Sequence, residues 1–220
     1  MSINTNLSQL RSQLPDEVTL VAVSKTKPVA DLMEAYEAGQ RIFGENKIQE
    51  MAEKQQQMPK DIQWHMIGNV QRNKVKYMAS FVDLIHGVDS VKLLNEINKQ
   101  AEKHQRTISC LLQLKIAQED TKFGMTSEDA YALLNSDHFK SLKNISIVGV
   151  MGMASFTNNA TQIKEEFTDL KNTFERLKKN TPELEIISMG MSGDFPLAIE
   201  CGSTMIRVGS RIFGARNYTN

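Results

Sequence analysis

Short apolar segments alternate with amphipathic segments along the whole chain. The apolar segments predict eight strands, at Leu20–Ser24, Arg41–Gly44, Gln63–Ile67, Leu84–Gly87, Ser109–Lys115, Ser146–Met151, Glu185–Met189 and Met205–Val208. Apolar residues at helical spacing predict helices between them, at Val29–Ala38, Asn46–Gln57, Asn73–Met78, Val91–Lys103, Ser127–Asn135, Thr161–Lys179 and Phe195–Glu200. A further helix is predicted at Leu7–Leu14, before the first strand.

The strand pattern favours a parallel barrel. The segment "ISIVGVMGM" (145–153) is apolar at consecutive positions, which is typical of parallel strands that are buried on both faces. Eight strand–helix repeats in 220 residues predict an α/β fold, a (β/α)8 TIM barrel with an extra N-terminal helix. A doubly wound open sheet is the alternative, but it usually has a glycine-rich turn after the first strand, and "VSKTKP" (23–28) has none. No linker-like segment divides the chain, so we expect a single domain over residues 1–220.

Composition and charge argue against several classes of function. Lys+Arg and Asp+Glu number 26 each, and no basic stripe is present, so neither nucleic acid nor a membrane surface is an expected partner. The N-terminus lacks the pattern of a signal peptide, and no apolar run is long enough to span a membrane. Cys110 and Cys201 predict buried thiols rather than a disulfide, and the histidines show no metal-ligand spacing. We therefore expect a cytoplasmic, monomeric protein.

The first predicted strand leads into a lysine. In "LVAVSK" (20–25), the side chains of Val21, Val23 and Lys25 share one face because successive residues of a strand alternate. If that face is the barrel interior, the Lys25 amine lies in a poorly solvated cavity, where burial lowers the pKa of a lysine and frees a nucleophilic amine. Such an amine can form a Schiff base with an aldehyde. Judged on this segment alone, a lysine whose amine reaches solvent is the more common case.

Glycines and serines near the C-terminus predict a phosphate site. In "GSTMIRVGSRIFGAR" (202–216), Arg207 and Gly209 share a strand face, and Ser210 begins a turn into the terminal helix. Ser192 follows the seventh strand, and barrels often bind phosphate with the loops after strands seven and eight. Strands one and eight are neighbours in a closed barrel, so the lysine would face this site, an arrangement that suits pyridoxal 5′-phosphate (PLP). Tight turns remain the simpler explanation for each glycine taken alone.

Five motifs together resemble one protein family. They are "VAVSKTKP" (21–28), "FGENKIQE" (43–50), "WHMIGNVQRNK" (64–74), "SMGMSGD" (188–194) and "GSTMIRVGSRIFGAR" (202–216). On these motifs, which are spread over nearly the whole chain, the sequence resembles the YggS/PROSC family of pyridoxal phosphate homeostasis proteins. The resemblance implies a barrel similar to that of alanine racemase, PLP as cofactor, a link to cellular vitamin B6 balance, and no established catalytic reaction.

The resemblance also implies roles for individual residues. Lys25 matches the lysine that forms the internal aldimine, Arg207 matches an arginine that faces the pyridine nitrogen, and Asn46 matches a residue near the cofactor. The positions that hold the phosphate in the family match Ser192, Gly209 and Ser210. Lys47 and Asn69 depart from the family pattern, and we expect neither of them to touch the phosphate site.

An arginine at the ring nitrogen limits the chemistry of the cofactor. A guanidinium can only donate hydrogen bonds, so a ring nitrogen that accepts one stays unprotonated. The ring is then a weak electron sink, which disfavours transamination and decarboxylation. We therefore expect a protein that captures PLP reversibly and passes it to apo-enzymes.

A slow PLP-dependent amino-acid racemase is the alternative function. It needs a second base opposite the lysine, and we expect no second domain that could supply the tyrosine used in the alanine racemase pattern. His65 or His86 would have to serve, although histidines packed in the core are more common. Of two competing amines, Lys27 is expected to point to solvent, and Lys122 is a candidate acceptor of PLP during release.

Overall fold

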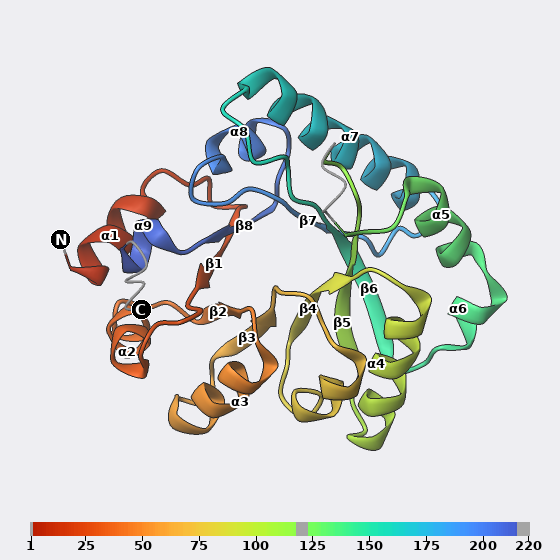
Figure 1. Cartoon of the computed structure of the whole chain (residues 1–220), viewed down its shortest axis with the longest axis horizontal. Coiled ribbons are helices and arrows are strands. Elements are labelled where there is room, and N and C mark those ends of the chain that lie inside the picture. Colours follow the sequence, from red (N-terminus) through yellow and green to blue (C-terminus); the bar gives the residue numbers. More distant parts are fainter. Residues whose placement is uncertain (1, 118–122, 215–220) are drawn as a thin grey trace.

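Eight parallel strands close into a barrel in the computed structural model, which describes residues 2–117 and 123–214 (Figure 1). The strands pair in chain order, and the last pairs with the first to complete the ring. They are β1 (Thr19–Val23), β2 (Ile42–Glu45), β3 (Gln63–Met66), β4 (Leu84–Val88), β5 (Ile108–Gln113), β6 (Ile145–Met151), β7 (Ile186–Ser188) and β8 (Met205–Val208). The predicted barrel is confirmed.

Helices surround the barrel and cover its outer face (Figure 1). They are α1 (Ile3–Arg11), α2 (Val29–Glu37), α3 (Ile48–Gln57), η1 (Arg72–Tyr77), α4 (Val91–Lys103), α5 (Ser127–Asn135), α6 (Asp137–Ser141), α7 (Ala160–Lys178), α8 (Phe195–Glu200) and α9 (Ser210–Phe213). The segment η1 is a short 3-10 helix. Within the described residues, no helix is both long and apolar enough to cross a membrane.

Two helices differ from the sequence prediction because serines cap them. Helix α1 begins at Ile3, earlier than predicted, since the Ser2 hydroxyl accepts the N–H of Thr5 at 3.2 Å. Helix α6 was not predicted. It begins after Ser136, whose hydroxyl accepts the N–H of Phe139 at 3.1 Å. In both cases a single polar side chain satisfies backbone donors that an apolar pattern does not reveal.

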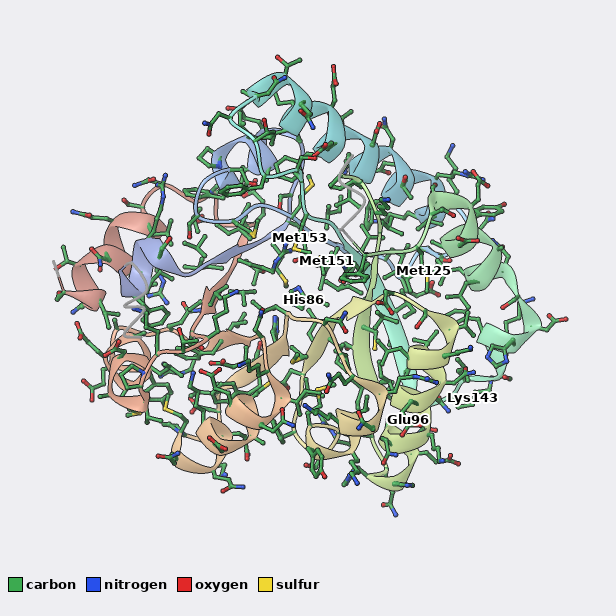
Figure 2. The ribbon with its side chains drawn as sticks, in the orientation of Figure 1. His86, Glu96, Met125, Lys143, Met151 and Met153 are labelled. Carbon is green, nitrogen blue, oxygen red and sulfur yellow. The ribbon has the colours of Figure 1, made fainter. Side chains whose placement is uncertain are left out.

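The side chains of each strand alternate between two layers. On β1, Leu20 and Ala22 belong to the core between strands and helices, whereas Val21 belongs to a smaller cluster inside the barrel. That inner cluster consists of Val21, Leu84, Leu111, Met151 and Met205. Figure 2 shows Met151 and His86 near the barrel axis. The inner face of β1 is therefore the one that continues to Lys25, as strand parity predicts.

Candidate functional site

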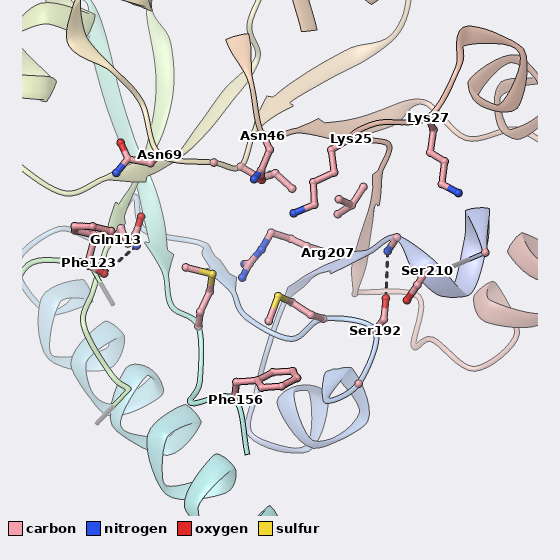
Figure 3. A pocket seen from close by; sticks show the side chains of 18 residues that line it. Lys25, Lys27, Asn46, Asn69, Gln113, Phe123, Phe156, Ser192, Arg207 and Ser210 are labelled. Carbon is pink, nitrogen blue, oxygen red and sulfur yellow. Dashed lines mark hydrogen bonds between the residues drawn. The ribbon is translucent and has the colours of Figure 1, made fainter. Parts of the chain in front are cut away.

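A cavity of about 460 Å³ opens where the strands of the barrel end (Figure 3). Barrels place their binding sites at this face, and the volume lies within the usual range of about 300–1,000 Å³ for small-molecule sites. All six predicted site residues line the cavity, and they are Lys25, Asn46, Ser192, Arg207, Gly209 and Ser210. The closure of the barrel therefore brings together segments from the two ends of the chain.

The amine of Lys25 points into this cavity (Figure 3). Lys25 follows the end of β1 by two residues and is half-buried. Lys27 also lines the cavity, and its amine donates to the carbonyl of Phe213 at 2.8 Å. The expectation that Lys27 points to solvent is wrong, because α9 places its C-terminal carbonyl within reach of this side chain. Lys122 lies outside the described residues.

The loops after β7 and β8 meet at the predicted phosphate site. The N–H of Gly209 donates to the Ser192 hydroxyl at 3.3 Å, and Nε of Arg211 donates to the Ser192 carbonyl at 2.9 Å. Ser210 lies at the start of α9, beside Gly209. These contacts hold the Ser192 loop beside Ser210, and both serines lie on one side of the cavity (Figure 3), where their hydroxyls can bind the oxygens of an anion.

Arg207 is a buried cation that lines the cavity from the inner face of β8. Its Nη1 donates to the carbonyl and to the hydroxyl of Ser188 at 2.9 and 2.7 Å, and Nη2 donates to the Gly152 carbonyl at 3.3 Å. A guanidinium has five N–H groups, so these three bonds leave two without a partner among the residues that the structure describes. Burial lowers the pKa of Arg207 to about 10, which still leaves it protonated at neutral pH.

A chain of buried polar groups continues from Arg207 into the barrel. The Ser188 hydroxyl lies 3.1 Å from Nδ1 of His86, and Nε2 of His86 lies 3.1 Å from Nδ1 of His65. Because Arg207 can only donate, the Ser188 hydroxyl proton is directed to His86, and Nε2–H of His86 then donates to His65. Burial lowers the pKa of His65 to about 3 and that of His86 well below its ordinary value, so both rings are neutral at physiological pH.

These two histidines do not line the cavity. The same holds for the described tyrosines, which are Tyr36, Tyr77 and Tyr131. Tyr218 lies outside the described residues.

A glycine that the sequence did not single out positions Asn46. A Cβ on Gly68 would lie 2.4 Å from the Asn46 carbonyl oxygen and 2.9 Å from its Cα. Only glycine therefore allows the segments after β2 and β3 to approach this closely. Asn69, which follows, also lines the cavity, on the side away from Ser192 and Ser210 (Figure 3), and the expectation that it does not touch the phosphate site stays a prediction.

Several other residues that line the cavity were missed at the sequence level. They are Gln113, Phe123, Met153, Phe156 and Met191. The segments "VMGMAS" (150–155) and "SMGMSG" (188–193) share a pattern whose second methionine, Met153 or Met191, lines the cavity. This repeat was the signal available for both methionines. Phe156 is 95% exposed, and nothing in the apolar pattern distinguishes it from a residue of an ordinary loop.

Comparisons with known proteins agree with this geometry. The chain matches the family model described as alanine racemase, N-terminal domain, over residues 1–217. It is 35% identical to the pyridoxal phosphate homeostasis protein of Haemophilus influenzae, over 100% of this chain and 98% of that protein. It is similar to the PipY structure of Synechococcus elongatus with PLP bound, at a TM-score of 0.88 and 37% identity, over 97% of this chain and 100% of that one. Alanine racemase of Clostridium difficile shares the fold at a TM-score of 0.80 and 13% identity, over 99% of this chain and 57% of that one.

Proposed function

We propose that this chain, which belongs to the family of pyridoxal phosphate homeostasis proteins, binds PLP reversibly through Lys25 and delivers it to apo-enzymes. One observation carries the proposal. The Lys25 amine, the Arg207 guanidinium and the serines of the phosphate site line one cavity of about 460 Å³. The PLP bound in the similar PipY structure supports the choice of ligand.

Different residues of the cavity suit different groups of PLP. PLP, when bound, supplies an aldehyde that reacts reversibly with a primary amine. Lys25 presents such an amine from the inner face of the barrel. The hydroxyls of Ser192 and Ser210 and the backbone beside Gly209 are suited to the phosphate, and Lys27 adds a positive charge on the same side, next to α9.

The chemistry of Arg207 favours binding of PLP over catalysis. It remains protonated and donates hydrogen bonds only, so it does not supply a proton to a pyridine nitrogen. No histidine or tyrosine among the described residues lines the cavity, whereas racemisation needs a second base. The residues of the cavity therefore favour a binding protein over the alternative racemase.

A transfer experiment tests delivery. PLP-loaded protein is mixed with an apo-enzyme and an excess of a scavenger that consumes free PLP. We expect the apo-enzyme to regain activity faster than it does with the same amount of free PLP. The Lys25→Ala protein, incubated with PLP in the same way, is the control and should give no advantage. Reactivation equal to that by free PLP would exclude delivery.

The cytoplasmic location and the monomeric state remain predictions.

A further inference from the structure

Lys25 lies in a tight turn that a threonine holds in an uncommon conformation. The N–H of Lys27 donates to the Ser24 carbonyl at 3.1 Å, which closes a turn with Lys25 and Thr26 at its centre. Thr26 has a φ of 65°, whereas the φ of Lys25 is negative, and this combination defines a type II turn. Such turns favour glycine or asparagine at the position of Thr26, and a β-branched residue is strained there. Other contacts must therefore hold the turn in place.

A buried ionic network binds both sides of this turn. Lys54 on α3 donates to the Ser24 carbonyl at 2.8 Å and to Oε1 of Glu45 and of Glu50, each at 2.7 Å. These three bonds use all the N–H donors of an ammonium group. Glu45 accepts the Ser24 hydroxyl at 2.6 Å, and Glu50 accepts the N–H of Thr26 at 2.6 Å. The residues before and after Lys25 are therefore both held from the outer side of the barrel.

The network is a poor source of stability for the fold. The side chain of Lys54 is 7% exposed and that of Glu45 is 0% exposed. Moving two ions out of water costs free energy that their attraction offsets only in part. Oε2 of Glu45 is buried without a hydrogen-bond partner in the described part of the chain. Replacing a buried ion pair with well-packed apolar side chains is often neutral or stabilising, so stability alone does not account for a network at the Lys25 turn.

We propose that Lys54, Glu45 and Glu50 are positioning residues that aim the amine of Lys25 into the cavity, an inference that rests on the proposed function of Lys25. The bond from Thr26 to Glu50 fixes the orientation of the peptide between Lys25 and Thr26, because a type I turn would rotate that N–H away. Without the network, the turn relaxes toward the conformation that threonine prefers, and Lys25 is displaced from its place at the cavity.

The first test separates covalent capture from binding. Lys54→Met keeps the side chain as far as Cε and removes the charged amine. We expect this variant to attach PLP to Lys25 about ten- to a hundredfold more slowly, as for other small misplacements of a reacting group. Its affinity for pyridoxine 5′-phosphate, which has an alcohol in place of the aldehyde, should change less than about twofold. Capture at the wild-type rate, or an equal loss of affinity for the alcohol, would overturn the proposal.

A matched control addresses general destabilisation. Arg106 also joins backbone carbonyls, those of Ala79 and Val82, each at 2.9 Å, and it does not line the cavity. Arg106→Met should lower stability without slowing capture. An Arg106 variant that slows capture as much as Lys54→Met does would show that the effect is not local, and would also overturn the proposal.

Hydrogen exchange needs no PLP, so it tests the turn even if Lys25 proves not to bind PLP. In the ligand-free protein, hydrogen exchange at the Thr26 amide should accelerate in Lys54→Met and in Glu50→Ala. The side chain of Glu50 is 22% exposed, so it is easier to replace than a fully buried one.

A rescue experiment returns to the capture assay. Adding Thr26→Gly to Lys54→Met should restore capture, because glycine adopts the positive φ without strain. Unchanged exchange at Thr26, or no rescue by glycine, would contradict the positioning role.

Discussion

The buried histidine pair predicts a loss of stability in mild acid. The pKa of His65 is about 3 in the folded protein because of burial, against an ordinary value of 6.5 that applies to the unfolded chain. Below pH 6.5 the unfolded chain therefore binds a proton that the folded protein does not, so stability is complete above this pH and is lost as the pH falls toward 3. Each pH unit within that window is worth about 1.4 kcal/mol. Lowering the pH from 7 to 5 should then cost about 2 kcal/mol through His65, and His86 adds to the loss in the same direction.

Denaturant unfolding of His65→Asn measures this contribution. The asparagine oxygen can accept the hydrogen bond from Nε2–H of His86 in place of Nδ1 of His65. The asparagine side chain does not titrate. We expect the variant to be less stable at every pH because of its smaller side chain, but to lose about 2 kcal/mol less than the wild type between pH 7 and pH 5. His104→Gln, at an exposed position, is the control and should keep the wild-type pH dependence. Parallel stability curves for His65→Asn and the wild type would show that protonation of His65 does not contribute to the loss of stability.

Two further substitutions test contacts at the site. Gly68→Ala should lower the free energy of unfolding by about 1–3 kcal/mol and weaken PLP binding, because the Cβ clashes with the Asn46 backbone. Thermal unfolding should show a fall of about 2–12 °C, whereas Gly193→Ala, where a Cβ meets nothing within 4 Å, should melt as the wild type does. Ser188→Ala removes a partner from Arg207 and from His86, and should cost about 1–3 kcal/mol for each buried group that is left unsatisfied. A loss below about 0.5 kcal/mol in guanidinium unfolding would mean that the chain of bonds from Arg207 contributes nothing to stability.

Local periodicity was enough to predict the barrel and the direction of Lys25. Strand parity in "LVAVSK" (20–25) placed Lys25 on the same face as Val21, which lies inside the barrel, and the apolar strands predicted a sheet covered by helices. The prediction that Lys25 faces the loops after strands seven and eight followed from the rule that strands one and eight are neighbours in a closed barrel. These inferences depend only on alternation along a strand and on the order of elements.

Contacts between distant segments could not be read from the sequence. Nothing in the sequence distinguishes Gly68 from a glycine of an ordinary turn, and only its approach to Asn46 shows why a side chain does not fit. Lys54 is a charged residue of an amphipathic helix, a type that usually faces solvent, yet it is buried against Glu45 and the Lys25 turn. Lys27 was expected to point to solvent because it lies beyond the first strand and before Pro28, but its partner, the Phe213 carbonyl of α9, is 186 residues away in the sequence. In each case, the deciding partner lies in another element of the fold.

Site mapping tests the central claim, that Lys25 captures PLP in this cavity, most directly. The protein is loaded with PLP, reduced with borohydride, digested, and analysed by mass spectrometry. We expect a stable adduct on the peptide that contains Lys25, which persists in Lys27→Ala and disappears in Lys25→Ala. No adduct, or an adduct that survives the loss of Lys25, would contradict it.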